Sequence, residues 1–227
     1  MIGGTGEDYM EGSDSHDKLE GGTGNDWAHG GNGVDEIKGE DGHDILYGGS
    51  GQDNIEGGAG SDIIDGGNDG DTISGGDGND LITANQGDDI VNGDAGNDMI
   101  LGSDGNDTLS GGADEDHIEA GTGNDIVYGN SGNDIILGGS GNDTLFGGSG
   151  ADKISGGSGD DSITGGLGMD LLYGGIGSDI FDFSSLADST EYASDIIEDF
   201  EDGIDQIGIS TTIANSIEDF IISNDGI

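Results

Sequence analysis

The stretch Gly138-Gly139-Ser140-Gly141-Asn142-Asp143-Thr144-Leu145-Phe146 decides the fold, because the same nine-residue pattern recurs along most of the chain. Aspartate occupies the sixth position of 20 consecutive units, from Asp8 to Asp179, and no insertion interrupts the period. Five positions before the aspartate the residue is glycine in 18 units, and two positions before it the residue is glycine in 17. A repeat this regular predicts a solenoid in which each unit stacks on its neighbours.

Composition alone would favour disorder. The 227 residues include 53 glycines and 50 acidic side chains against three lysines, which gives a formal net charge of -47. Chains with so much charge and so few aromatic residues usually cannot bury enough apolar surface to fold. However, the residue two positions after each repeat aspartate is apolar in all 20 units. Disorder needs no such register, so the pattern indicates a folded chain.

The charge and the residue types exclude several classes of function. Nucleic-acid binding is not expected, because arginine is absent and the three lysines, Lys18, Lys38 and Lys153, lie far apart. No apolar stretch is long enough for a membrane span, and the N-terminus does not resemble a Sec-type signal. Cysteine is absent, so disulfides cannot staple the fold.

The repeat predicts an all-β fold. Glycines at fixed places permit a tight six-residue turn in which main-chain carbonyls approach a common point, and the remaining three residues suit a short strand with one inward side chain. Strands this short must stack into parallel ladders. We expect two repeats per coil, and hence a right-handed parallel β-roll of 18-residue coils with two facing parallel sheets over residues 1–182.

Stacked aspartates in such turns predict calcium sites. Carboxylate and carbonyl oxygens at flexible distances suit Ca²⁺, whereas Mg²⁺ demands stricter geometry and zinc prefers His or Cys. An ion between equivalent turns of successive coils would allow up to about 18 ions. The predicted carboxylate ligands are Asp26, Asp35, Asp44, Asp53, Asp62, Asp71, Asp80, Asp89, Asp98, Asp107, Asp125, Asp134, Asp143, Asp152, Asp161, Asp170 and Asp179.

Backbone ligands and weaker sites complete the prediction. The backbone ligands are expected at Gly48, Gly57, Gly75, Gly138, Gly141, Gly147, Gly150, Gly156, Gly159, Gly165 and Gly168. Binding should be weaker at Asp8, Asp17 and Asp116, and wherever Ser13, Ser15, Asp69, Ala84, Asn85, Asp94 or Asp114 interrupts the turn pattern. Extracellular calcium modules bind in the range of about 10⁻⁴ to 10⁻³ M, so we expect the chain to be unfolded at cytosolic calcium and folded outside the cell.

The glycine-aspartate unit resembles that of the RTX (repeats-in-toxin) family, over residues 3 to 182. The resemblance implies a Ca²⁺-bound parallel β-roll in which aspartate carboxylates and glycine-turn carbonyls share each ion. It also implies secretion from a Gram-negative-type bacterium by type I secretion machinery, without a cleaved leader and with an uncleaved C-terminal signal.

The last segment, residues 183–227, breaks the nine-residue phase. It is similar to the segment that follows the repeats in serralysin-type proteases and in the R modules of mannuronan epimerases. Apolar residues such as Phe200, Ile207 and Ile209 suit strands that close the open end of the roll. We therefore expect a C-terminal cap that also occupies the place of the secretion signal.

No catalytic constellation accompanies the repeats. The chain lacks a Cys nucleophile and a His-Glu-x-x-His motif, and no serine is paired with a histidine, so we expect a non-catalytic module. His16, His29, His43 and His117 fall at differing repeat positions, so a shared zinc site is not expected. Outward aromatics such as Trp27, Tyr47 and Tyr128 leave open an alternative, a free-standing extracellular structural or surface-layer solenoid that binds polysaccharide or associates end to end.

Overall fold

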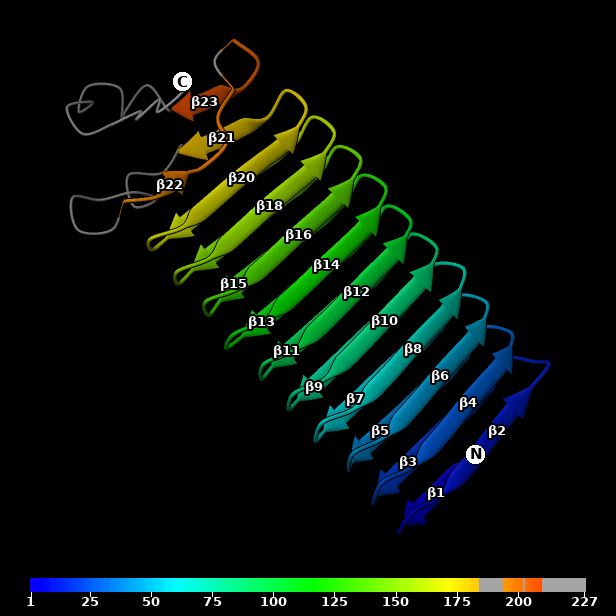
Figure 1. The fold of residues 1–227 in the computed structure, drawn as a ribbon. Helices are drawn as coiled ribbons and strands as arrows, with labels where there is room; N and C mark the ends of the chain where they lie inside the picture. Colours follow the sequence, from blue (N-terminus) through cyan, green and yellow to red (C-terminus); the bar gives the residue numbers. More distant parts are fainter. Residues whose placement is uncertain (184–193, 202, 210–227) are drawn as a thin grey trace.

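The computed structural model describes residues 1–183, 194–201 and 203–209. The described residues form two parallel sheets of 12 and 11 strands, with no helix. Figure 1 shows the strands stacked side by side along one axis, from the N-terminus to the C-terminal strands. The prediction of an all-β parallel roll is therefore confirmed.

Consecutive strands alternate between the sheets, so each sheet contains every second strand. The odd sheet consists of β1 (Ile2–Thr5), β3 (Lys18–Thr23), β5 (Glu36–Asp41), β7 (Asn54–Ala59), β9 (Thr72–Asp77), β11 (Ile90–Ala95), β13 (Thr108–Ala113), β15 (Ile126–Ser131), β17 (Thr144–Ser149), β19 (Ser162–Leu167), β21 (Ile180–Phe183) and β23 (Gln206–Ile209). The even sheet consists of β2 (Tyr9–Ser13), β4 (Trp27–Asn32), β6 (Ile45–Ser50), β8 (Ile63–Asn68), β10 (Leu81–Gln86), β12 (Met99–Asp104), β14 (His117–Thr122), β16 (Ile135–Ser140), β18 (Lys153–Ser158), β20 (Leu171–Ile176) and β22 (Ile196–Ile197).

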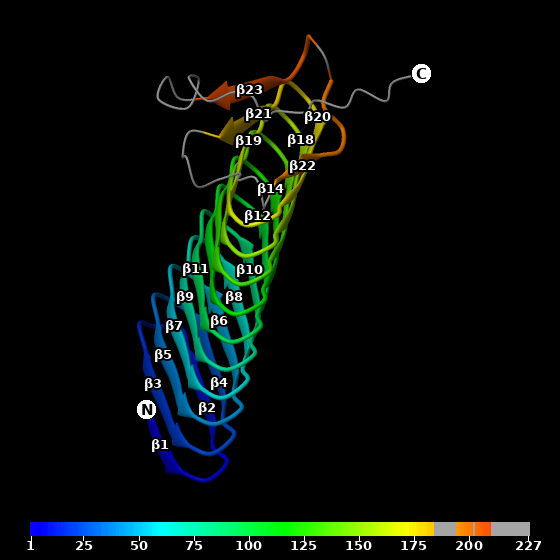
Figure 2. The same ribbon diagram turned by 90° about the vertical axis from the view of Figure 1, so that its left-hand side faces the viewer.

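Each coil contains two repeats, as the nine-residue period predicted. Within a sheet, residues pair with those 18 positions later, as in Ile136↔Ile154 and Ile64↔Ile82. Viewed from the side, the coils are flattened loops with one sheet on each face (Figure 2). Because the register is constant, every repeat position forms a straight column along the roll.

The strands are longer than expected. We predicted three-residue strands and six-residue turns, but a typical strand such as β17 has six residues and runs through both glycines. Glycines of neighbouring coils stay in register, for example Gly139↔Gly157, because without side chains their backbones can pair closely. The second glycine takes a left-handed conformation within the strand, with φ 109° at Gly139. Only three residues per repeat, such as Gly141-Asn142-Asp143, remain as the turn.

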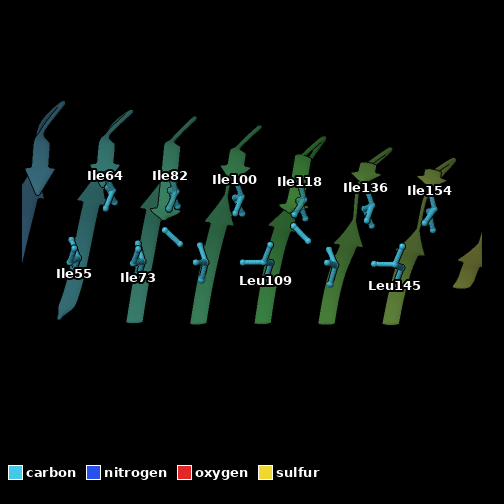
Figure 3. Close-up of a cluster of buried hydrophobic side chains, with 14 of the residues drawn as sticks. Ile55, Ile64, Ile73, Ile82, Ile100, Leu109, Ile118, Ile136, Leu145 and Ile154 are labelled. Carbon is cyan, nitrogen blue, oxygen red and sulfur yellow. The ribbon is translucent and has the colours of Figure 1, made fainter. Parts of the chain in front are cut away.

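The core is a double row of apolar side chains between the sheets. The residue two positions after each repeat aspartate is buried in all 20 repeats, with at most 2% of its surface exposed. Ile64, Ile82 and Ile100 of the even sheet face Ile55 and Ile73 of the odd sheet (Figure 3). The inward position that the pattern predicted is therefore confirmed.

Both sheets continue beyond the last repeat. β22 pairs with β20, and β23 pairs with β21, both in parallel. Ile197, Phe200 and Ile207 pack against the end of the core. The rest of the predicted cap and secretion-signal region, residues 184–193, 202 and 210–227, lies outside the described residues, and the boundary at residue 183 stays a prediction.

A membrane span was not expected from the sequence. Within the ranges that the structure describes, there is no helix long and apolar enough to cross a bilayer.

Candidate calcium sites

The repeat aspartates form two columns, one at each edge of the roll. Each aspartate ends a three-residue turn and directly precedes the next strand, so its position is set by the strand register. From Asp26 to Asp161, and at Asp179, at most 3% of each aspartate's surface is exposed. The structure therefore places the predicted carboxylates inside the turns rather than on the outer surface.

One oxygen of each carboxylate connects neighbouring coils. The backbone N–H of Asp26 donates to Oδ1 of Asp44 at 2.7 Å, and the N–H of Asp125 donates to Oδ1 of Asp143 at 2.9 Å. The same bond recurs along both columns, and we call this series the aspartate ladder. It satisfies a turn N–H that has no strand partner.

The second carboxylate oxygen has no such bond. Oδ2 is buried and accepts no hydrogen bond in the repeat aspartates from Asp8 to Asp161 and in Asp179. Buried carboxylate oxygens are normally hydrogen-bonded, paired with a cation or bound to a metal, because desolvation of an uncompensated negative charge is costly. A column of such oxygens therefore calls for a cation along each edge.

The first glycine of each repeat leaves room beside this oxygen. A Cβ at Gly138 would lie 2.5 Å from Oδ2 of Asp143 and 2.6 Å from the carbonyl oxygen of Gly156 in the next coil. Gly48 shows the same arrangement with Asp53 and Gly66. A carboxylate oxygen and a main-chain carbonyl from successive coils thus converge on the space that a side chain would fill. We call this space the glycine cradle.

The donor set suits calcium. The described residues contain no group of three or more His, Cys, Asp or Glu side chains arranged to hold a metal, so most oxygens of a site must come from the main chain. A mixture of carboxylate and carbonyl oxygens is the coordination that Ca²⁺ accepts and that zinc does not favour. The residues present therefore fit the predicted ion, with Oδ2 as its carboxylate ligand.

Burial raises the pKa of several of these carboxylates. Desolvation raises the pKa of Asp71, Asp98 and Asp152 to about 7, against the lowering effect of the backbone hydrogen bond that each accepts. The same cause raises the pKa of Asp143 and Asp161 to about 6, and neighbouring aspartates in the column add to the effect. Near neutral pH the calcium-free columns therefore carry charges that the fold disfavours.

Comparison with known families agrees with this geometry. A model described as the RTX calcium-binding nonapeptide repeat, four copies long, matches in overlapping segments that cover residues 1–188. The chain belongs to this RTX family. It is a calcium-binding RTX β-roll protein, and the resemblance seen in the repeats is confirmed.

Solved structures and curated proteins were also compared with the chain. A hyperactive, Ca²⁺-dependent, β-helical antifreeze protein from an Antarctic bacterium resembles the RTX chain with 22% identity and a TM-score of 0.32, covering 82% of this chain and 86% of the other. No curated protein matches.

A second ladder crosses the RTX turns at the residue before each aspartate. The N–H of Asn124 donates to Oδ1 of Asn106 at 2.9 Å, and the N–H of Asn142 donates to Oδ1 of Asn124 at 2.7 Å. His43 serves the same purpose, since its Nδ1 accepts from the N–H of Ser61. We call this series the turn ladder. The sequence analysis missed it, although the frequent asparagine at this position was a signal.

The aspartate ladder also extends beyond the repeats. Oδ1 of Asp195 accepts from the N–H of Asp170, and Oδ1 of Asp205 accepts from the N–H of Asp179, both at 3.1 Å. Their spacing of 25 and 26 residues breaks the period, so we did not predict them. The signal was present, because both precede an apolar residue by two positions, as Asp195-Ile196-Ile197 shows.

Asp199 is a further residue that the analysis missed. Its two carboxylate oxygens accept from the N–H groups of Gly174 and Gly175, each at 2.9 Å. The carboxylate of Asp199 thus satisfies the N–H groups of the last glycine pair at the end of the roll, where no further repeat is stacked.

The predicted weaker sites differ in their surroundings. Asp8 and Asp17 are only half-buried at the N-terminal end, whereas Asp116 is 3% exposed and takes part in the ladder like its neighbours. Ala84 and Ala120 are fully buried and place a real Cβ where other repeats have the cradle. Among the predicted backbone ligands, Gly48, Gly57, Gly75, Gly138, Gly147 and Gly156 line cradles, and Gly165 lies beside Oδ2 of Asp170. Gly141, Gly150, Gly159 and Gly168 lie in the turns with φ between 124° and 151°.

Proposed function

We propose that this RTX chain is the calcium-dependent folding module of a secreted bacterial protein, unfolded at cytosolic calcium and folded in the extracellular medium. The observation that carries the proposal is the column of buried Oδ2 atoms without hydrogen-bond donors. Without a cation, each added coil places another buried carboxylate beside those of the aspartate column, and the like charges repel one another. With calcium bound, the same oxygens would connect successive coils through the ion.

The weak affinity of extracellular calcium modules supports folding outside the cell rather than in the cytosol. With dissociation constants of about 10⁻⁴ to 10⁻³ M, each site contributes on the order of 1 kcal/mol at millimolar calcium and almost nothing at cytosolic levels. Because each repeat contacts only its neighbours, many such contributions add along the stack and give a cooperative transition. Up to about 18 ions would act together.

The deciding experiment is a calcium titration of the whole chain, followed by far-UV circular dichroism and light scattering and reversed with EGTA. We expect a steep gain of β signal at millimolar calcium, and little response to magnesium. Full β signal in the stripped protein, or equal folding with magnesium, would contradict the proposal.

Export is proposed to follow the type I route with an uncleaved C-terminal signal, because folding would be deferred until the chain meets external calcium. Removing residues 184–227 should abolish export by a co-expressed type I system, while a variant with Asp143→Ala should still be exported. Export that survives the deletion would rule out a C-terminal signal. We assign no catalytic activity to the module, since its carboxylates are committed to calcium.

A further inference from the structure

The outer faces of the two sheets differ in a way that calcium binding does not explain. The first residue of an even strand is apolar at Tyr9, Trp27, Ile45, Ile63, Leu81, Met99, Ile135, Leu171 and Ile196, and only His117 and Lys153 interrupt the row. In the odd sheet the same position is mostly polar, with Thr72, Thr108 and Thr144 as examples. The apolar row, which we call the ridge, therefore runs along one face only.

Most of the ridge is exposed to solvent. Ile63 is 45% exposed, Leu81 38%, Met99 45% and Ile196 55%, whereas Trp27, Ile45 and Leu171 are half-buried. Neighbouring members pair in register, as in Ile63↔Leu81 and Leu81↔Met99, so the ridge is continuous from β2 to β12 and is interrupted beyond it only at His117 and Lys153. Contiguous exposed apolar strips of this kind mark interaction surfaces. The even strands lie side by side over the length of the roll in Figure 1.

A shallow groove runs beside the ridge on the same face. The fifth residue of each even strand from β2 to β20 is glycine or a small polar residue, and a hollow is lined there by Gly67, Asn85 and Ser103 together with Asp65, Asn68, Gln86 and Asp104. Ridge and groove are therefore parallel and four residues apart along each strand. If two copies faced each other across a two-fold axis parallel to the long axis of the roll, the ridge of each copy would lie in the groove of the other.

The charge of this face is compatible with a second copy. Among the described residues, only Glu11, Asp65 and Glu119 are acids at the first, third or fifth position of an even strand, and Asp104 lines the hollow from a sixth position. Most other acids of the described repeats lie in the turns, where calcium would neutralise the repeat aspartates. Six-residue strands and a 4.8 Å spacing give the face about 1,000 Å², which matches the roughly 800 Å² per partner of a stable interface.

A sugar-binding platform fits the same face less well. Tyr9 and Trp27 stack on each other with their ring centroids 4.3 Å apart and their planes within 1°. Each ring thus covers one face of the other, and Trp27 is further flanked by His29 and Tyr47. Tyr9 lies in the first coil and is 67% exposed, so the pair leaves one open ring face at one end of the described roll, whereas a sugar-binding platform along the roll would need several.

We infer that the folded chain forms a two-fold dimer through the outer face of the even sheet, with the ridge of each copy in the groove of the other. The inference rests on the calcium-dependent folding proposed above, because the face exists only in the folded roll. The occupant is a second copy of this chain, since one surface supplies both complementary shapes.

The test is sedimentation equilibrium of the full chain in millimolar calcium, with circular dichroism of the same samples. We expect a mass twice the chain mass of 22.6 kDa. Leu81→Asp should weaken dimerisation about tenfold or more, because its carboxylate would enter, twice per dimer, a groove that already contains Asp65 and Asp104. The matched control is Ile90→Asp, which alters the same strand position on the odd sheet, where Ile90 is 57% exposed, and should leave the dimer intact.

Cross-linking tests the geometry, because the chain has no cysteine of its own. A mixture of Leu81→Cys and Asn85→Cys chains should form a disulfide between the two variants, and neither alone should cross-link comparably. A folded chain that stays monomeric, with or without affinity for polysaccharide, overturns the dimer but leaves the proposed function standing. A dimer that survives Leu81→Asp, or efficient cross-linking of Leu81→Cys alone, overturns the ridge-in-groove interface. A chain that shows no β signal in calcium overturns both proposals.

Discussion

The backbone N–H of Asp26 donates to Oδ1 of Asp44, one coil later, at 2.7 Å, while Oδ2 of Asp44 is buried without a hydrogen-bond donor. One carboxylate therefore has two roles. Oδ1 connects the coils in any folded state, and Oδ2 adds a charge that only a cation or a proton can compensate. This division explains why one residue type can both build the turn and make folding conditional.

Loss of a fully buried aspartate should lower calcium affinity more than loss of a half-buried one. Asp143→Ala removes a predicted ligand from an intact turn, so the calcium midpoint should rise and the folded state should lose about 1 kcal/mol or more. Asp17 is only half-buried at the end of the roll, so Asp17→Ala should have a smaller effect. Calcium titrations monitored by circular dichroism measure both, and equal shifts would contradict this ranking.

Filling a glycine cradle should weaken its site. In Gly138→Ala the new Cβ would meet Oδ2 of Asp143 and the Gly156 carbonyl within 2.6 Å, so one of them must move. Ala84→Gly is the matched reversal, because it opens a cradle that is filled in the natural sequence. We expect the calcium midpoint to rise in Gly138→Ala and to fall in Ala84→Gly.

The expected gain in calcium affinity of Ala84→Gly is opposed by backbone entropy, because replacing alanine with glycine in the unfolded chain lowers the stability of the fold by about 0.4–1 kcal/mol. A fall in the midpoint would therefore report the site rather than chain flexibility. If both substitutions raised the midpoint, the cradle would not be part of the calcium site.

Acid should stabilise the calcium-free roll. The pKa of Asp71 and of Asp98 is raised to about 7 in the folded chain by burial, above the ordinary value of 3.8. Between about pH 4 and pH 7 the folded state therefore binds more protons than the unfolded state, and its free energy of unfolding falls as pH rises. Calcium-stripped protein should show more β signal near pH 5 than near pH 8, as measured by circular dichroism.

Calcium should reverse that trend, because protons compete with the ion for the same oxygens. In millimolar calcium the thermal midpoint should therefore fall on acidification through about pH 6. A calcium-free roll that is equally unfolded at both pH values would argue against buried carboxylates as the obstacle to folding.

The turn ladder should contribute stability that is independent of calcium. Asn124→Ala removes the acceptor of the Asn142 N–H, which should cost about 1 kcal/mol in thermal or urea unfolding at saturating calcium. Gln52→Ala is the control, because Gln52 holds the same repeat position, is exposed and accepts no such bond. Identical unfolding curves for the two variants would show that the turn ladder is incidental.

The end of the roll should depend on Asp199. Asp199→Ala leaves the N–H groups of Gly174 and Gly175 without their carboxylate, so the last coil should lose about 1.5–3 kcal/mol of local stability. Hydrogen exchange of β20 in calcium would measure this loss. Glu198→Ala, at the neighbouring position, should leave the exchange rates unchanged, and equal protection in both variants would contradict an end-capping role.

Much of the fold was predictable because a strict nine-residue period allows few arrangements of the strands. A period of nine with one apolar position fixed the inward column, from Met10 to Phe181, and all of it is buried. The aspartate columns of the candidate site were predictable for the same reason, since aspartates in one phase must stack once the coils stack. The strand length was predicted wrongly, because glycine propensity suggests a turn, whereas glycines in register with those of the next coil pair as strand.

The sequence by itself determined the repeat, the two-sided coil and the residues of the aspartate columns, because these depend only on which residues share a phase. Only the tertiary structure decided how each carboxylate divides its two oxygens, which side chains form the turn ladder, and that Asp195 and Asp205 continue the aspartate columns after the period ends. Those features arise from the stacking of one coil on another, which brings together groups 18 or more residues apart. A nine-residue pattern does not show which of these distant groups come into contact.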